Sequence, residues 1–475
     1  MEAVKTQSGL YIEQMYTGCL AEAAYYIESN GVAAVIDPMR ETAPYVEKAA
    51  ERGATIKYVF ETHFHADFVS GHVDLANRTG AQIVYGPTAT TDFDAIISED
   101  GQVFRIGDIT IEVLHTPGHT PESSCYLLRD ENGKEYAVFT GDTMFIGEVG
   151  RPDLAVKSDL SQHDLAGMLY DSLRNKLMVL PDEVIVYPAH GAGSACGKNI
   201  SDERWSTIGN QKQTNYALQP MDKEEFIKTV THGIMPPPQY FSKNAMLNKK
   251  GTESIDKILS ERVVPMEVAA VEAAMSEGAL VLDTRSEEAF STGHVAGSLF
   301  IGLDGSFASW VGTLIEDMKQ PIVVITDEGR EEEAVLRLAR VGYNNALGYL
   351  KGGVKAWEAA GHTLATVENM TADQLAELSQ QGKATIVDVR KPNEYKSEHV
   401  VDALSFPLDF INQHLNELDK DETYYLHCLG GYRSLIAASV LKQNGYTKLV
   451  NILGGWRAIQ ETNLPKTDYV CPSTL

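Results

Sequence analysis

The stretch Thr62-His63-Phe64-His65-Ala66-Asp67-Phe68 carries two histidines and an aspartate at alternating positions. It directly follows the apolar run 56–60, so we expect its side chains on a loop that leaves a strand, where imidazole and carboxylate groups can bind a cation. The pattern is almost that of a site for two metals, but Phe68 stands where the last ligand belongs. One redox-active metal is therefore favoured over two hydrolytic ones.

Three more loops carry residues of the same kinds. Apolar runs at 109–114, 136–139 and 184–187 predict strands, and each run ends just before a polar cluster. These clusters contribute His119, Asp142 and His190. Because loops beyond strand ends gather at one edge of a sheet, we expect all four loops to form one metal site.

Composition limits the classes of function. A length of 475 residues predicts about three domains, and 43% hydrophobic residues allow each to be globular. The formal charge of -26 argues against nucleic acid and anionic membrane surfaces as partners. We see neither a secretory signal in residues 1–8 nor a run near the roughly 18 apolar residues of a membrane span. Five scattered cysteines do not resemble a disulfide framework, so we expect a cytoplasmic protein with reduced thiols.

A connector divides the chain. Met235-Pro236-Pro237-Pro238-Gln239 and the polar stretch 242–252 predict an extended segment, because consecutive prolines disfavour helix. We therefore predict a first domain at 1–245.

The remainder is a duplication. Asp283-Thr284-Arg285 matches Asp388-Val389-Arg390, and His294-Val295 matches His399-Val400, both at an offset of 105 residues. Gly352-Gly353 matches Gly454-Gly455 at an offset of 102, so about three residues have been gained or lost inside the unit. Both copies alternate strands with helices, which favours a parallel sheet covered on both faces. Two α/β domains are predicted, at 262–365 and 370–472.

The motifs Thr-His-x-His-Ala-Asp, Thr-Pro-Gly-His-Thr, Thr-Gly-Asp and Pro-Ala-His-Gly, in this order, resemble those of the metallo-β-lactamase superfamily. Within it, 62–67 and 141–145 are similar to persulfide dioxygenases. The resemblance implies an αββα sandwich and one Fe(II) per chain, held by His63, His119 and Asp142. Two imidazoles and one carboxylate on one face suit non-haem Fe(II), because positions for substrate and O₂ stay open. His65, Asp67 and His190 would orient these ligands or handle protons.

Zinc hydrolases of the same superfamily, such as glyoxalase II, complete two metal sites with the equivalents of His65, Asp67, the next histidine and His190. Phe68 cannot bind a metal, and an apolar wall lowers the cost of excluding water. An alternative stays open, in which Phe68 only packs beneath a site that still binds two metals.

Substrate contacts are harder to read from the sequence. Arg151, Lys198 and Arg204 follow the metal loops and could bind an anionic thiol carrier such as glutathione or coenzyme A. Each alone is more often an ordinary surface cation. Cys196 lies in a loop of small residues after His190, where it could relay sulfane sulfur or be passive.

The second copy contains Cys428-Leu429-Gly430-Gly431-Tyr432-Arg433-Ser434 between a predicted strand and helix. Cys-x-x-Gly-x-Arg-Ser resembles the active loop of rhodanese sulfurtransferases. Such a loop directs the backbone N-H groups of 429–432 and the positive end of a helix at Cys428, and Arg433 adds a cation. Both favour a thiolate that attacks sulfane sulfur and holds it as a persulfide.

The first copy lacks this chemistry. Its corresponding strand, 321–326, runs into Asp327-Glu328-Gly329-Arg330-Glu331-Glu332-Glu333, a loop that is two residues shorter and has no cysteine. Its glutamates would oppose an anionic sulfur species. We predict an inactive rhodanese-like domain, resembling the pseudo-domain of three-part bacterial dioxygenase-rhodanese fusions. Its role as scaffold, oligomer contact or spacer is open.

These features predict an Fe(II) persulfide dioxygenase that oxidises low-molecular-weight thiol persulfides with O₂ to sulfite. Sulfur transfer at Cys428 would form or use thiosulfate, in sulfide detoxification by a homo-oligomer. Two alternatives are a dinuclear zinc thioesterase of glyoxalase II type with an attached sulfurtransferase, and a non-catalytic sulfur-binding module. The thiol carrier and the direction of sulfur transfer stay open.

Overall fold

The computed structural model describes residues 3–5, 9–156 and 159–471, so part of the N-terminal stretch searched for a secretory signal lies outside it. Contacts divide the chain into two units, one within 1–257 with Ala339–Gly342, the other Ile258–Leu338 with the residues from Tyr343 onward. Within these described ranges, no helix is both long and apolar enough to cross a membrane.

The first unit is built on two mixed sheets that face each other. The first sheet orders its strands as β1 (Ala3–Lys5), β2 (Tyr11–Thr17), β3 (Glu22–Ser29), β4 (Val32–Ile36), β5 (Thr55–Phe60), β6 (Gln82–Tyr85) and β7 (Ile96–Ile97). The second orders them as β13 (Ser206–Thr207), β12 (Ile185–Pro188), β11 (Glu135–Gly141), β10 (Ser124–Arg129), β9 (Ile109–His115) and β8 (Val103–Ile106). The strands predicted from the apolar runs are confirmed.

Aromatic and branched side chains from both sheets fill the space between them, including Tyr25, Phe60 and Phe139. Burying one such side chain contributes about 1.5–3 kcal/mol, so this layer is a main source of stability.

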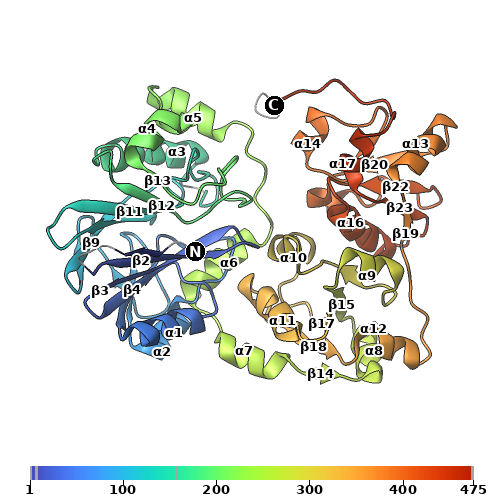
Figure 1. Ribbon diagram of the computed structural model, residues 1–475, viewed down its shortest axis with the longest axis horizontal. Coiled ribbons are helices and arrows are strands. Elements are labelled where there is room, and N and C mark those ends of the chain that lie inside the picture. The colour runs from blue at the N-terminus through green and yellow to red at the C-terminus, as the bar shows by residue number, and fades with distance from the viewer. Residues whose placement is uncertain (1–2, 6–8, 157–158, 472–475) are drawn as a thin grey trace. The chain divides into compact units, whose positions relative to one another are not determined.

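Helices cover the two outer faces of the sandwich. On the first sheet lie α1 (Ala43–Arg52) and α2 (His72–Thr79), which bury Tyr45, Ala49 and Leu75. On the second lie α3 (Gln162–Ser172), the π-helical turn η1 (Leu173–Leu177), α4 (Ile208–Thr214), the short η2 (Tyr216–Leu218) and α5 (Lys223–Thr231). The expected αββα sandwich is confirmed (Figure 1).

The connector prediction is wrong for most of 242–252. Residues 242–250 belong to α6 (Phe241–Lys250), whereas the proline-rich segment before it and residues 251–254 after it lack regular structure. The helix places Phe241, Asn244 and Asn248 on one buried face, at spacings of three and four residues. Two of the three are polar, so the stretch looked solvent-exposed in the sequence. The predicted limit at 245 falls inside this helix, and the domain limits stay predictions.

The second unit contains two five-stranded parallel sheets, as expected for two rhodanese-like α/β domains. The first sheet orders its strands as β14 (Pro265–Met266), β18 (Ala346–Leu350), β17 (Ile322–Ile325), β15 (Leu280–Asp283) and β16 (Leu299–Phe300). The second orders them as β19 (Glu368–Met370), β23 (Leu449–Ile452), β22 (Tyr424–His427), β20 (Thr385–Asp388) and β21 (Leu404–Ser405).

The helices of the second unit follow the same duplication. After α7 (Ile255–Arg262), the first repeat contains α8 (Val268–Ser276), α9 (Glu287–Thr292), α10 (Phe307–Leu314), α11 (Glu331–Arg340) and α12 (Gly353–Ala359). The second contains α13 (Ala372–Gln380), α14 (Pro392–Ser397), η3 (Leu408–Phe410), α15 (Ile411–His414), α16 (Tyr432–Gln443) and α17 (Gly455–Gln460). The parallel sheets with covering helices match the expectation for both copies.

Candidate metal centre and candidate sulfur-transfer loop

Three of the predicted ligands converge where strands of the first unit end. His63 follows β5, His119 follows β9, and Asp142 follows β11. Their ligand atoms lie together, with Nε2 of His63 3.7 Å and Nε2 of His119 3.3 Å from Oδ2 of Asp142. Among the described residues, neither Nε2 atom and neither carboxylate oxygen has a hydrogen-bond partner. Buried polar groups are normally bonded, so this donor set fits a metal ion.

The imidazole rings of His63 and His119 each have a polar partner at Nδ1, on the side away from Asp142. Nδ1 of His63 lies 3.0 Å from the Thr62 hydroxyl, and Nδ1 of His119 lies 2.9 Å from the carbonyl oxygen of Arg151. Such partners fix the ring so that Nε2 faces the metal. Burial, together with the neighbouring histidines, lowers the pKa of His63 well below its usual range. The ring is then neutral, as a ligand must be.

His65, Asp67 and His190 form a second group of buried side chains that could hold an ion. Nε2 of His190 lies 3.6 Å from Asp67 and 3.5 Å from Asp142. His65, however, turns Nε2 toward two other carboxylates, at 3.1 Å from Asp37 and 3.4 Å from Glu61. Burial lowers the pKa of His65, but Asp37, Glu61 and Asp67 outweigh it and raise the pKa to about 9.

Phe68 is fully buried and packs on His65. The two rings lie 4.4 Å apart between centroids, with an interplanar angle of 36°. Residue 68, where the sequence pattern places a further ligand, thus carries an apolar ring, and this ring limits how His65 can turn.

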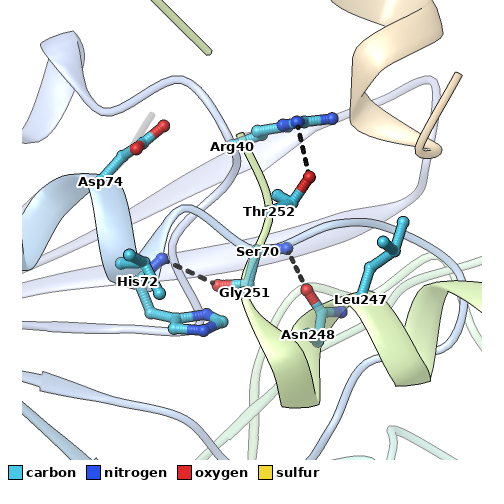
Figure 2. Close-up of a pocket in the computed structure, with 9 residues that line it drawn as sticks. Arg40, Ser70, His72, Asp74, Leu247, Asn248, Gly251 and Thr252 are labelled. Atoms are coloured by element: carbon cyan, nitrogen blue, oxygen red, sulfur yellow. Dashed lines mark hydrogen bonds between the residues drawn. The ribbon is translucent and has the colours of Figure 1, made fainter. Parts of the chain in front are cut away.

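Four residues that support the site were missed by sequence reasoning: Asp37, Glu61, Ser70 and Asn248. Asp37 accepts hydrogen bonds from the backbone N-H and hydroxyl of Thr62 at 2.7 and 2.8 Å, and Glu61 accepts one from Ser70. Asn248 of α6 donates its amide to the carbonyl oxygens of His65 and Phe68 at 2.8 and 2.7 Å. It also accepts the N-H of Ser70, beside which it lines a small pocket (Figure 2).

Asp37 and Glu61 could have been found, because both follow apolar strands as the ligands do. Asn248 gave no such signal, since it lies about 180 residues away in the chain.

Two of the three cations predicted to contact substrate are already engaged. Arg151 is buried and forms a two-point ion pair with Asp153 at 2.6 and 2.7 Å. Lys198 donates to the carbonyl oxygens of Thr229 and His232. Arg204 is exposed and lies over the ring of Tyr16. Lys198 and Arg204 are both exposed, but Lys198 is bonded to two carbonyl oxygens, so Arg204 is better placed to meet a ligand from solvent.

Cys196 lies at the metal centre. Its sulfur belongs to a group with Asp142 and His190 whose ligand atoms all lie within 4.8 Å of one another. Burial and the carboxylates of Asp67 and Asp142 raise the pKa of its thiol well above the usual range.

In the second repeat, Cys428 lies buried between β22 and α16. The N-H of Gly431 donates to its sulfur at 3.1 Å, and the hydroxyl of Ser434 lies 3.6 Å away. Of the predicted cradle at 429–432, the backbone of Gly431 therefore makes the direct contact. Arg433 forms a two-point ion pair with Glu394 at 2.6 and 2.9 Å. The carboxylate therefore partly neutralises the positive charge of Arg433.

Comparison with known families agrees with this geometry. Residues 17–190 match the model of the metallo-beta-lactamase superfamily, and residues 267–360 and 371–462 each match that of the rhodanese-like domain.

Three relatives illustrate the range of named activities. Human persulfide dioxygenase ETHE1 is 32% identical over 44% of this chain and 74% of its own length. The probable hydroxyacylglutathione hydrolase glo2 of Schizosaccharomyces pombe is 31% identical over 37% of this chain and 66% of its own length. The crystal structure of a metallo-beta-lactamase from Staphylococcus aureus is 30% identical, with a TM-score of 0.64 over 73% of this chain and 99% of that one. The chain belongs to the metallo-β-lactamase superfamily and carries two rhodanese-like domains in its C-terminal half.

Proposed function

We propose that the chain is an Fe(II) persulfide dioxygenase coupled to rhodanese sulfur transfer, acting in sulfide detoxification. The observation that carries this proposal is Phe68, which stands at a ligand position of the sequence pattern and is buried against His65. His65 directs Nε2 at Asp37 and Glu61, whereas the facing ligand atoms of His63, His119 and Asp142 have no hydrogen-bond partner among the described residues. A single centre with two imidazoles and one carboxylate favours Fe(II) over a pair of zinc ions.

Iron held by these residues would supply the redox chemistry that joins O₂ to sulfur. In the overall reaction, a persulfide R-S-SH, O₂ and water give the thiol R-SH, sulfite and two protons. The outer sulfur is oxidised, both atoms of O₂ are reduced, and the S-S bond breaks. The chain contributes a His63 ring kept neutral by burial, an apolar wall at Phe68 that excludes water, and the neighbouring pair Asp67 and His190 to hold a proton.

At the second site, the Cys428 thiolate attacks the outer sulfur of a persulfide donor. Its S-S bond breaks, the donor thiolate leaves, and Cys428 becomes a persulfide. Sulfite then attacks this outer sulfur through its lone pair, which releases thiosulfate and restores the thiolate. The N-H of Gly431 stabilises negative charge on the cysteine sulfur throughout.

Arg204 is the best candidate to bind an anionic thiol carrier such as glutathione or coenzyme A, because it is exposed on the unit that holds the metal site, whereas exposed Lys198 is bonded to two carbonyl oxygens. Cys196 is a candidate contact for the substrate sulfur. Its replacement by serine should slow O₂ uptake and leave sulfur transfer at Cys428 intact. The cytoplasmic location and the homo-oligomer belong to this proposal as well.

A dinuclear zinc thioesterase is the second candidate. The group of His65, Asp67 and His190 favours it, as does the named activity of the Schizosaccharomyces pombe relative. A non-catalytic sulfur-binding module is the third, and it requires that neither metal be bound.

Metal content tests these candidates. Purified protein is reconstituted separately with iron and with zinc. The dioxygenase should bind about one iron per chain. Phe68→His should strengthen binding of a second metal by about 10- to 100-fold, whereas Phe64→His, a neighbouring change outside the ligand pattern, should not. Two tightly bound zinc ions in the unaltered protein, together with S-acyl thiol hydrolysis, would reject the dioxygenase in favour of the thioesterase.

A further inference from the structure

Tyr432, in the Cys428 loop, contacts the cysteine-free repeat. The hydroxyl of Tyr432 donates a hydrogen bond at 2.8 Å to the carbonyl oxygen of Gly302, in the cysteine-free repeat. Its ring lies edge-on to Phe300 of that repeat, with centroids 6.0 Å apart. Tyr432 is the residue after Gly431, whose N-H faces the cysteine sulfur. A residue next to the reactive sulfur is therefore held by the domain that lacks a cysteine.

Gly305 shows how closely the two repeats fit. A methyl group at this position would lie 2.3 Å from Cζ and 2.7 Å from the hydroxyl oxygen of Tyr432. The backbone of Gly305 is not in the left-handed region, so alanine is conformationally allowed there. The tyrosine ring is thus the obstacle, and the absence of a side chain at 305 leaves the space that it fills.

The same face of the cysteine-free repeat also holds the helix that begins at Tyr432. The N-H of Phe300 donates to the hydroxyl of Ser439 at 3.0 Å, and the amide of Gln443 donates to the carbonyl oxygen of Gly297 at 2.9 Å. Both Ser439 and Gln443 belong to α16, whose N-terminal end faces Cys428. Three contacts along one helix fix its position more firmly than a single one could.

We infer that the cysteine-free repeat positions the active loop, with Gly302 and Gly305 holding Tyr432 so that the N-H of Gly431 points at the Cys428 sulfur. Tyr432 is a positioning residue in this scheme, because it acts through Gly431. The inference rests on the proposed sulfur transfer at Cys428. It assigns the cysteine-free repeat a part in the chemistry of its neighbour.

Gly305→Ala in the full chain tests the inference. Because a methyl group must displace the ring, kcat for sulfur transfer from thiosulfate to cyanide should fall by about 10- to 100-fold with a much smaller change in KM. Gly18→Ala is the matched control, since a methyl group there meets nothing within 4 Å and its backbone is not left-handed. Tyr432→Phe keeps the ring, loses the hydrogen bond to Gly302, and should lower kcat by about threefold to tenfold.

A double-mutant cycle separates positioning from general destabilisation. If the methyl group acts by pushing the ring, Gly305→Ala should have no further effect once Tyr432→Ala has removed that ring. Effects that add, or an unchanged kcat in folded Gly305→Ala, would overturn the inference. Should Gly305→Ala fail to fold, an unchanged kcat in Tyr432→Phe overturns it equally.

Alkylation of Cys428 by iodoacetamide, followed by peptide mass spectrometry, separates this inference from the proposed function. The alkylation needs no sulfur donor, so it reports on the loop even if the unaltered protein transfers no sulfur. Slower alkylation of Cys428 in Gly305→Ala, with Cys471 unchanged as an internal reference, supports positioning. Equal rates contradict it. A lack of sulfur transfer in the unaltered protein would instead reject the proposed function at Cys428.

Discussion

The two rhodanese-like repeats share a scaffold and differ in one loop. In each, a buried arginine pairs with the aspartate two residues before it at 2.6 Å, as Arg285 with Asp283 and Arg390 with Asp388. Each arginine also donates at 2.8 Å to a carbonyl oxygen eight residues further on. In each, a histidine stacks on an aromatic ring four residues earlier. The duplication therefore kept the groups that hold the fold.

The glycine pairs show where the repeats diverge. A methyl group at Gly455 would lie 2.4 Å from the carbonyl oxygen of Cys428, whereas one at Gly353 would meet nothing within 4 Å. Gly455 packs against the active loop, and the shorter loop of the first repeat leaves that space empty. The first repeat keeps the rhodanese-like fold without a Cys428-type loop, so the loop is needed for the chemistry and not for the fold.

Loss of the nucleophile should have the largest effect. Cys428→Ser should lower sulfur transfer from thiosulfate by about 10³-fold or more, because serine is a far weaker nucleophile toward sulfur. Thiocyanate formation measures this, and O₂ uptake should stay nearly unchanged. Asp327→Cys, at the corresponding point of the first repeat, should not restore transfer. Restored transfer would mean that the two loops are equivalent.

Loss of a scaffold arginine should affect both repeats alike. Arg285→Met and Arg390→Met each leave a buried aspartate without its partner, so each should lower the free energy of unfolding by about 3–5 kcal/mol. Urea unfolding measures the change. A loss in the second repeat alone would show that the first no longer depends on this pair.

Substitution of the equivalent glycines Gly455 and Gly353 should affect sulfur transfer in one repeat only. Gly455→Ala should lower the rate of sulfur transfer by about tenfold, because the loop backbone must shift away from the new methyl group. Gly353→Ala shares the left-handed backbone and should cost about 1–2 kcal/mol of stability without affecting transfer. Equal effects on transfer would contradict the packing argument.

The smallest expected effect concerns pH. Burial raises the pKa of Glu394, but Arg433 outweighs it and holds the pKa below its usual range. A lowered pKa in the folded state contributes stability above the unfolded value of about 4.3. Glu394→Gln should therefore be less stable than the unaltered protein by about 1 kcal/mol near pH 7. The difference in stability should vanish as the pH falls through the lowered pKa of Glu394. Thermal unfolding at pH 7 and pH 3.5 measures it, and a difference that persists at the lower pH would contradict the prediction.

Much of this arrangement could be predicted from the sequence. Ligands such as His63 and Asp142 end apolar strands, and that pattern brings residues distant in sequence to one sheet edge. The duplication was equally plain, because the residues that hold each repeat recur at a fixed offset.

The remainder depended on contacts that sequence patterns do not record. Asn248 supports the metal loop from α6, a helix whose buried face is largely polar, and such a sequence predicts a solvent-exposed connector. Arg433 was expected to give its charge to Cys428, but its partner Glu394 lies 39 residues earlier. The fit of Tyr432 against Gly305 joins two repeats, and no periodicity within either one predicts it.

Oxygen uptake tests the central claim most directly. Iron-loaded Cys428→Ser protein, purified without oxygen and given glutathione or coenzyme A persulfide, should consume O₂ and release sulfite in equal amounts, because the second site can no longer convert sulfite to thiosulfate. His63→Ala in the same background should abolish both. Sulfite release and O₂ uptake at one to one would support the dioxygenase. No O₂ uptake, with hydrolysis of an S-acyl thiol by the zinc-loaded protein, would contradict it.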